Sequence, residues 1–275
     1  MPSAALVHPL HQLHRYACAT VGAAFLLLIA GGLVTSTDSG LAVPDWPLSY
    51  GKFFPPMVGG ILYEHGHRMI AGVVALMIAG LAAWLWRVEP RRWVRRLGAA
   101  ALGGVIAQAL LGGLTVILLL PPAVSITHAC LAQLVFCSLA GLALATSPAW
   151  HEAAAHPADS ATRMQTALLA SAVCVQLILG ALIRHTGQGL TLHIAGAIMV
   201  LLLSAGLAWR VSRKAPRDAG LWRIVRLLPV AVVAQIGLGL SVWAFGRPIL
   251  LATAHVAFGA AVLALSCISA LWAHR

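Results

Sequence analysis

The chain has 275 residues, of which 60% are hydrophobic and only 9% carry a charge. A soluble domain does not need so much apolar surface, so the composition indicates an integral membrane protein. The formal net charge of +11 would suit a nucleic-acid partner, but the placement of the basic residues argues against that class of function.

Eight apolar stretches are long enough to cross a bilayer, which takes about 20 helical residues. They are continuous and rich in Leu, Ala and Gly, without the period-two alternation of barrel strands. The sequence therefore predicts an all-α membrane protein, with the first apolar run retained as a helix rather than cleaved as a signal peptide. The predicted spans are 16–36, 66–86, 98–119, 126–146, 165–184, 191–210, 227–246 and 251–272.

The basic residues are distributed unevenly between the predicted loops. Of the 18 Lys and Arg residues, only Lys52, Arg68, Arg184 and Arg247 fall on one side of the spans. Because cytoplasmic loops carry the excess of Lys and Arg, we expect both termini in the cytoplasm and these four residues outside. The basic excess then indicates topology and an attraction to anionic lipid rather than nucleic-acid binding.

The two halves of the sequence repeat each other. VIAQALLG is followed 127 residues later by VVAQIGLG, and the same offset carries His128 onto His255. Upstream, GGLVTSTDSGL (31–41) resembles GALIRHTGQGL (180–190) at an offset of 149, so the first half has an extra segment between its first two spans. An even number of spans per copy predicts two tandem four-helix bundles related by a pseudo-twofold axis along the membrane normal.

We accordingly divide the chain into an N-terminal half, 1–147, and a C-terminal half, 148–275. The segment TSPAWHEAAAHPADSATR (146–163) is polar enough to be a cytoplasmic connector between them.

Four of the 12 histidines lie at the start of the even-numbered spans, at one depth and two in each half: His67, His128, His193 and His255. A single His on an apolar helix is more often a packing residue, but four at matched height indicate ligation. Two facing imidazoles inside a helical bundle suit a six-coordinate heme iron, whereas structural zinc takes four ligands with Cys or carboxylate among them. We predict two pairs, His67 with His128 and His193 with His255.

The first of these histidines stands in the segment LYEHGHRMIAG (62–72), which also contains other ionisable groups. Glu64 and His67 are three residues apart and share a helix face, whereas His65 points elsewhere. The repeat does not choose between His65 and His67 as the ligand, but the shared face favours His67. Arg68 is expected either to snorkel outward or to pair with an anionic group such as a heme propionate. Because the second half lacks the acid, one pocket is expected to perform chemistry and the other to hold a permanent cofactor.

The string GGLVTSTDSGLAVPDWPLSYG, followed by EHGHRMIAG and a single His opening each later even-numbered span, resembles the heme A synthase family over essentially the whole chain. This resemblance implies oxidation of a methyl group of heme O to a formyl group, giving heme A for cytochrome oxidase. It implies that heme b is held by His193 and His255. The substrate heme would then lie at His67 and His128, with Glu64 as the essential acid.

One departure from the family concerns the first outer loop. Many members have a cysteine pair in the pattern SGLxCPDWPLC, where this chain has Val43 and Ser49. All five cysteines fall within predicted helices and none forms a C-x-x-C motif, so a thiol–disulfide relay in this loop is excluded. The aromatic and proline-rich loop 42–63 is either an interfacial anchor or a lid over the substrate pocket.

Two routes remain open for oxidation of the methyl group. In one, a ligand on the substrate side detaches and the iron activates oxygen. In the other, electrons leave through heme b and water attacks the oxidised carbon, and Glu64 would take up a proton or orient that water.

Two other function classes also suit paired histidines: a diheme b-type electron-transfer cytochrome of the membrane, and a heme carrier or chaperone. All four histidines lie at one face, which argues against electron transfer across the membrane. The resemblance implies a place in the bacterial cytoplasmic membrane with the histidines toward the outer side, a heme O synthase as neighbour and an unidentified electron donor. The oligomeric state is not predicted.

Overall fold

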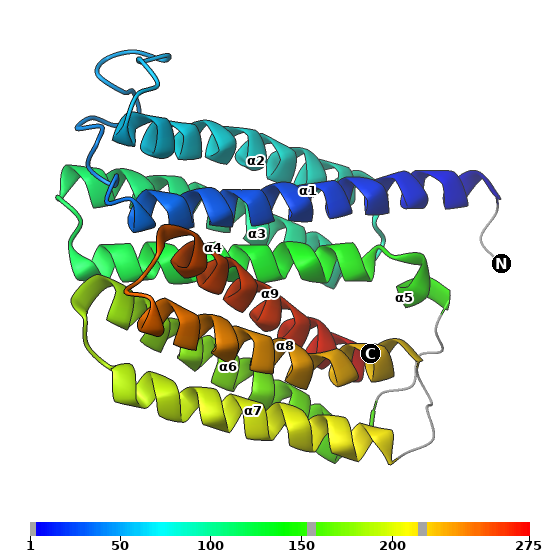
Figure 1. The fold of residues 1–275 in the computed structure, drawn as a ribbon. Coiled ribbons are helices and arrows are strands. Elements are labelled where there is room, and N and C mark those ends of the chain that lie inside the picture. Colours follow the sequence, from blue (N-terminus) through cyan, green and yellow to red (C-terminus); the bar gives the residue numbers. More distant parts are fainter. Residues whose placement is uncertain (1–3, 153–157, 214–218) are drawn as a thin grey trace.

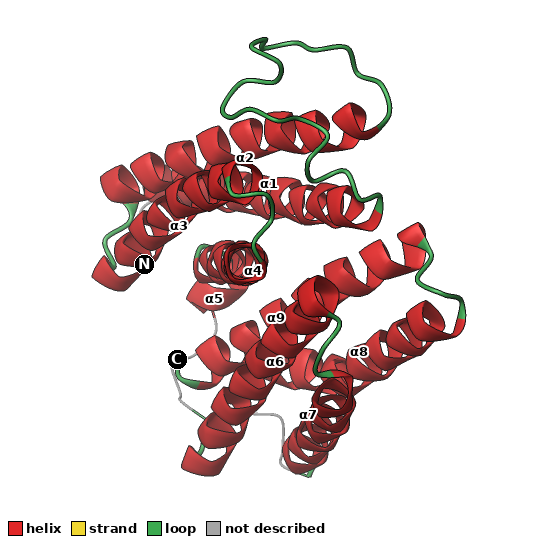
Figure 2. Cartoon of the chain, turned by 90° about the vertical axis from the view of Figure 1, so that its left-hand side faces the viewer, coloured by secondary structure: helices red, strands yellow, loops and turns green. Residues whose placement is uncertain are grey.

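The computed structural model describes residues 4–152, 158–213 and 219–275, and these are helical apart from the connecting loops (Figures 1 and 2). Part of the predicted connector, 153–157, and the basic residues Lys214 and Arg217 lie outside the described residues. The helices are α1 (Ala4–Ser36), α2 (Gly60–Val88), α3 (Arg92–Ile117), α4 (Pro122–Ala145), α5 (Pro148–Glu152), α6 (Ser160–Thr186), α7 (Leu190–Ser212), α8 (Ala219–Ala244) and α9 (Ile249–Ala273).

All helices except α5 are long and apolar enough to cross a membrane, which confirms the eight predicted spans. Most helices begin a few residues earlier than predicted. The largest difference is in α1, whose 33 residues extend about 50 Å at 1.5 Å per residue, well beyond an apolar core of about 30 Å. The part of α1 from His11 to Ser36 is by itself long and apolar enough to cross a membrane.

The long helices pack as two groups of four. In the first group, α1 and α3 each contact α2 and α4; in the second, α6 and α8 each contact α7 and α9. The groups meet where α9 contacts α1 and α4, and where α4 contacts α6 (Figure 2). Half of the apolar window of α4 and of α9 is buried, against 28% or less in every other span. Helices α4 and α9 are therefore the centre of the molecule.

The core is made of aliphatic side chains with few aromatic contacts between helices. Leu139 of α4 and Leu263 of α9 are fully buried, and Phe25 packs on Phe136 with ring centroids 5.8 Å apart. Large apolar side chains such as Leu76, which is 75% exposed, cover the outside of the spans. A surface of this kind is typical of helices that face lipid.

The two ends of the helix bundle differ in what they carry. Helices α2, α4, α7 and α9 all begin at one end, called here the loop end, where the long loop 37–59 projects (Figure 1). The start of α1, the C-terminus and α5 lie at the opposite end (Figure 1). There Trp150 of α5 packs between Trp93 and Trp272, with centroids 6.0 and 5.8 Å away, and closes that end of the core.

Candidate functional site

The four predicted ligands all lie at the loop end, close to the N-termini of their helices. His67 is on α2, His128 on α4, His193 on α7 and His255 on α9, and each side chain is half-buried. Because these helices start at the same end, the four imidazoles are brought to one level of the bundle, as the sequence predicts.

His193 and His255 face each other across the second helix group. Their ring centroids are 6.4 Å apart and their planes are inclined by 69°. Histidines that ligate one metal from opposite sides have centroids about 6 Å apart, because each metal–nitrogen bond is about 2 Å long and each ring adds its own radius. The pair therefore has the separation that a bis-histidine iron requires. In the first group, His67 lies close enough to His128 for the two rings to interact electrostatically.

Each of the four imidazoles packs against a glycine on the preceding long helix. A Cβ added to these glycines would approach the histidine Cε1 to 3.1 Å for Gly31 and His67, 3.3 Å for Gly112 and His128, 3.2 Å for Gly180 and His193, and 2.9 Å for Gly239 and His255. All four separations are shorter than ordinary carbon–carbon contacts of about 3.5–4.0 Å. Glycine is therefore the residue that lets each ring lie directly against the neighbouring backbone.

The nitrogens of these rings are oriented alike. In all four histidines Nδ1 is buried and has no hydrogen-bond partner. In His65 the buried nitrogen without a partner is instead Nε2, because its Nδ1 lies 2.8 Å from the hydroxyl of Ser49. His65 is thus engaged by the loop, whereas His67 shares the glycine contact and ring orientation of the other three histidines.

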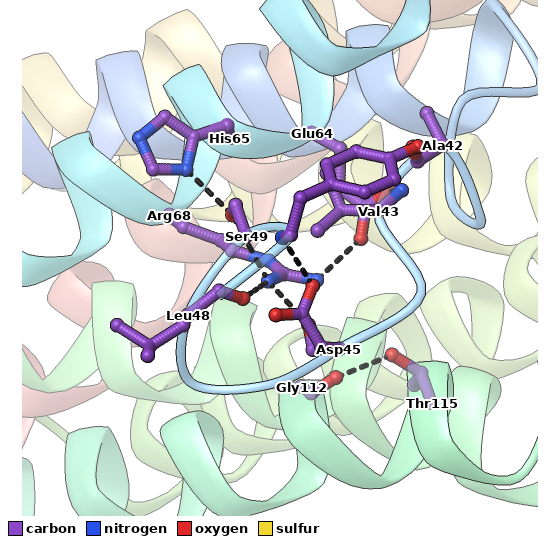
Figure 3. A network of polar contacts seen from close by, with 11 residues as sticks. Ala42, Val43, Asp45, Leu48, Ser49, Glu64, His65, Arg68, Gly112 and Thr115 are labelled. Atoms are coloured by element: carbon purple, nitrogen blue, oxygen red, sulfur yellow. Dashed lines mark hydrogen bonds and ion pairs between the residues drawn. The ribbon is translucent and has the colours of Figure 1, made fainter. Parts of the chain in front are cut away.

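Glu64 and Arg68 hold the loop 37–59 against α2 (Figure 3). The Glu64 carboxylate accepts a hydrogen bond from the backbone N–H of Val43 at 2.8 Å and one from Arg68 Nη2 at 2.6 Å. Arg68 Nη1 donates to the carbonyls of Asp45 and Leu48 at 2.8 and 2.9 Å. With 4% of its surface exposed, Glu64 is a buried carboxylate that is paired and hydrogen-bonded, as such a charge must be.

The two loop positions at which the resembling family often has cysteines both contact this cluster. Val43 bonds Glu64 through its backbone, and Ser49 bonds His65 through its hydroxyl. Both side chains are fully buried, and the five cysteines of the chain are free. Hydrogen bonds and the Glu64–Arg68 ion pair therefore fix the loop here.

Asp45 organises the tip of the same loop. Its carboxylate accepts from the N–H of Tyr50 at 2.6 Å and from that of Gly51 at 2.8 Å. These backbone bonds, first that from Gly51, outweigh desolvation and hold the pKa of Asp45 below its usual value. Beyond this turn, Phe53 and Phe54 are 77% and 80% exposed and project away from the helices.

Arg184 is a site residue that sequence reasoning did not single out. It lies near the C-terminal end of α6, where its guanidinium donates to Ser36 Oγ at 2.6 Å and to the Gly32 carbonyl at 3.3 Å, both on α1. Ser36 is also 3.1 Å from Thr253 Oγ1 of α9. These contacts join the two helix groups at the level of the histidines. The sequence signal that could have indicated it is an Arg followed by His185 at the end of an apolar helix, where ionisable residues are costly and often functional.

Among the described residues, no group of three or more His, Cys, Asp and Glu side chains could hold a bare metal ion. The donor set consists of imidazole pairs, which suits a porphyrin iron that already has four nitrogen ligands and takes two axial ones.

Comparisons with known proteins agree with this geometry. The profile of a family described as cytochrome oxidase assembly protein matches residues 59–194, which contain Glu64 and three of the four histidines. A heme A synthase of Halalkalibacterium halodurans is 26% identical over 262 residues, 84% of this chain and 86% of that protein. The chain belongs to the heme A synthase family.

Other heme A synthases are more similar over shorter stretches. That of Lysinibacillus sphaericus is 42% identical over 102 residues, 36% of this chain and 33% of that protein. That of Bacillus pumilus is 32% identical over 172 residues, 60% of this chain and 56% of that protein. The matched stretch thus spans about a third to a half of the length of these two relatives, and most of the length of the Halalkalibacterium halodurans protein.

Proposed function

We propose that the protein is a heme A synthase, an oxidoreductase that converts the ring methyl group of heme O to a formyl group. The observation that carries the proposal is the repeated arrangement of two imidazole pairs at one end of an eight-helix membrane protein of this family. Among the described residues, only the His67–His128 pair has a buried carboxylate close by in the chain, Glu64, which stands three residues before His67.

His193 and His255 would hold heme b as a permanent cofactor. Their 6.4 Å separation suits axial ligation from both sides, and both side chains are half-buried between their helices. Heme b bound there would supply a one-electron carrier beside the substrate site. Both ligands lie on helices of the second group, which supports a C-terminal domain, 148–275, that holds this cofactor.

His67 and His128 would bind the substrate, heme O, in the N-terminal domain, 1–147. His67 is preferred to His65 because it contacts Gly31 as His193 contacts Gly180, at the offset of 149 that relates the two halves. The matching glycine contacts at both offsets support a pseudo-twofold relationship between the helix groups. The positive-inside distribution supports cytoplasmic termini and a loop end on the outer face.

Glu64 and Arg68 would act on the substrate from the edge of this site. Glu64 is held by two donors, and a carboxylate so placed can accept a proton lost from the reacting carbon or orient a water molecule. Arg68 would offer its guanidinium to a propionate of the substrate heme, while its Nη1 keeps the loop 37–59 closed over α2. The loop would thereby act as a lid that excludes bulk water from the reacting edge.

The proposal is tested by expressing the protein in a host that makes heme O but not heme A. Mass analysis of the extracted pigments should detect heme A or its alcohol precursor together with heme b. Heme b alone, at two per chain, would indicate a diheme cytochrome instead. A host expressing the Glu64→Gln variant is the matched control for background conversion.

A further inference from the structure

Three of the four histidines are held by a glutamine from the preceding long helix. In each pair the amide Nε2 donates to the backbone carbonyl of the histidine itself: Gln108 to His128 at 3.0 Å, Gln176 to His193 at 2.6 Å and Gln235 to His255 at 2.9 Å. Because only the NH2 of an amide can donate to a carbonyl, this contact fixes the orientation of the amide. Each Oε1 is then left buried and without a partner.

These glutamines stand at a fixed spacing from the glycines that contact the imidazoles. In QALLG (108–112), QLILG (176–180) and QIGLG (235–239), the glutamine comes four residues before the glycine. Residues at that spacing lie one above the other on a helix face. One face of each helix therefore contacts both the backbone and the ring of the same histidine.

The fourth histidine lacks half of this arrangement. The corresponding segment of α1 is LLIAG (27–31), in which Gly31 contacts His67 but Leu27 stands where Gln176 stands in α6, 149 residues later. Leu27 has no side-chain donor for the His67 carbonyl, although its backbone contacts the His67 ring as the backbones of the three glutamines contact their histidines. His67 therefore lacks the side-chain amide bond to its own carbonyl that the other three histidines have, in the site that contains Glu64.

The recurrence argues for a role beyond general helix packing. A buried amide in an apolar helix is costly unless it is hydrogen-bonded, and such groups often join membrane helices without any other function. If the amides only joined helices, they could bond any carbonyl of the neighbouring helix. Instead, each bonds the carbonyl of the histidine that faces the site.

We propose that each Gln-x-x-x-Gly segment is the positioning device of one heme-ligating histidine, and that Leu27 makes His67 the weakly held ligand, so that heme exchanges in the first half and not in the second. The inference rests on the proposed heme ligation. The amide bond to the histidine carbonyl would fix the helix turn that carries the ring, and such outer contacts orient metal-binding histidines.

The glycine contact is tested with a matched pair on α8. A Cβ at position 239 would lie 2.9 Å from His255 Cε1, whereas a Cβ at position 237 meets nothing within 4 Å. In the purified protein Gly239→Ala should shift the spectrum of the reduced heme b from six-coordinate toward five-coordinate. Gly237→Ala should leave it unchanged. An unaltered spectrum in Gly239→Ala would overturn the role of the glycine.

The asymmetry is tested by exchanging the residues at the glutamine position. The measurement is the rate at which purified protein loses heme to excess apomyoglobin, with mass analysis separating heme O and heme A from heme b. Leu27→Gln should slow loss of heme O and heme A, and Gln176→Leu should speed loss of heme b, each by roughly three- to tenfold, the worth of one ordinary hydrogen bond. Leu26→Gln, at a 61% exposed neighbour, and Gln165→Leu, elsewhere on α6, are the controls.

The outcomes separate this inference from the proposed function. If the protein binds heme through these histidines and the rates change as expected, the inference holds even when no heme A is formed. If heme A is formed but Leu27→Gln and Gln176→Leu behave like their controls, the inference fails alone. A protein without bound heme contradicts both.

Discussion

Arg68 Nη2 donates to Glu64 Oε1 at 2.6 Å, one helical turn apart on α2, and both side chains are largely buried beneath the loop 37–59. The carboxylate also accepts the Val43 N–H, so one cluster holds the loop and places an acid three residues from His67, in the proposed substrate site. The consequences for catalysis and for stability can be measured separately.

Glu64→Gln should abolish most turnover while leaving heme binding intact. The amide keeps an acceptor for the Val43 N–H but cannot take up a proton, and loss of a general acid or base typically costs about 10²–10⁴ in rate. Conversion of heme O to heme A is measured in membranes, with heme b content as the internal standard. Glu89→Gln, which removes the Glu89–Arg91 ion pair of 2.7 Å at the opposite end, is the control and should retain activity. Full turnover in Glu64→Gln would refute its catalytic role.

Arg68→Met should destabilise the protein more than Glu64→Gln does. Removing the guanidinium leaves the 4% exposed Glu64 carboxylate without a counter-charge, and breaking a buried pair from one side costs about 3–5 kcal/mol. Thermal unfolding in detergent measures the difference. The double variant Arg68→Met with Glu64→Gln should recover part of the loss, because no charge is then stranded. Additive losses in the double variant would show that the two groups are not coupled.

His65 and His67 should differ in their effect on bound heme. Ser49 Oγ lies 2.8 Å from His65 Nδ1, so His65→Ala should loosen the loop and leave the heme spectrum unchanged. His67→Ala should instead remove heme O from the first-half site, measured as the ratio of heme O plus heme A to heme b in the purified protein. The reverse result would make His65 the ligand and contradict the assignment based on Gly31.

The turn at Asp45 should open in acid. Its pKa is lowered in the folded protein by the bonds from Gly51 and Tyr50, so its stabilising effect is complete above the unfolded pKa. The effect is lost as the pH falls from the ordinary range of an Asp carboxyl through the lowered folded pKa. Hydrogen exchange of the Tyr50 and Gly51 amides, corrected for intrinsic rate, should accelerate in that range. Asp45→Asn should show no such pH dependence. If the variant kept the pH profile of the wild type, the carboxylate of Asp45 would not be its cause.

The membrane-spanning helices were predictable because long apolar runs are visible in the composition of the sequence alone. A continuous apolar run in a chain with 9% charged residues has few alternatives to a membrane helix, and the starts of α2, α4, α7 and α9 place their histidines at one end. The repeat offset of 127 related His128 to His255, one in each half, without any coordinates.

The contacts of the loop were not predictable from the same patterns. Glu64 and His67 were expected to share a face, but nothing in the sequence indicates that Glu64 bonds the backbone of Val43 or that Ser49 bonds His65. Such contacts depend on how an irregular segment folds back, and irregular segments have no period. Short helix α5 was missed for the same reason.

Arg184 and the glutamines were missed because each looks ordinary alone. An Arg near a helix end can reach the interface, and a Gln in a span can join neighbouring helices without other function. Only the coordinates show that Arg184 crosses to Ser36 of the other helix group and that Gln176 bonds the carbonyl of His193. The Gln-x-x-x-Gly spacing was visible in the sequence, but its meaning required the histidine partner.

The most direct test of the account is the heme content per chain of the purified protein and of its four single His→Ala variants. We predict that His193→Ala and His255→Ala lose heme b, and that His67→Ala and His128→Ala lose the heme O and heme A fraction while keeping heme b. A colourless wild-type protein, or variants whose pigment matches the wild type, would contradict it.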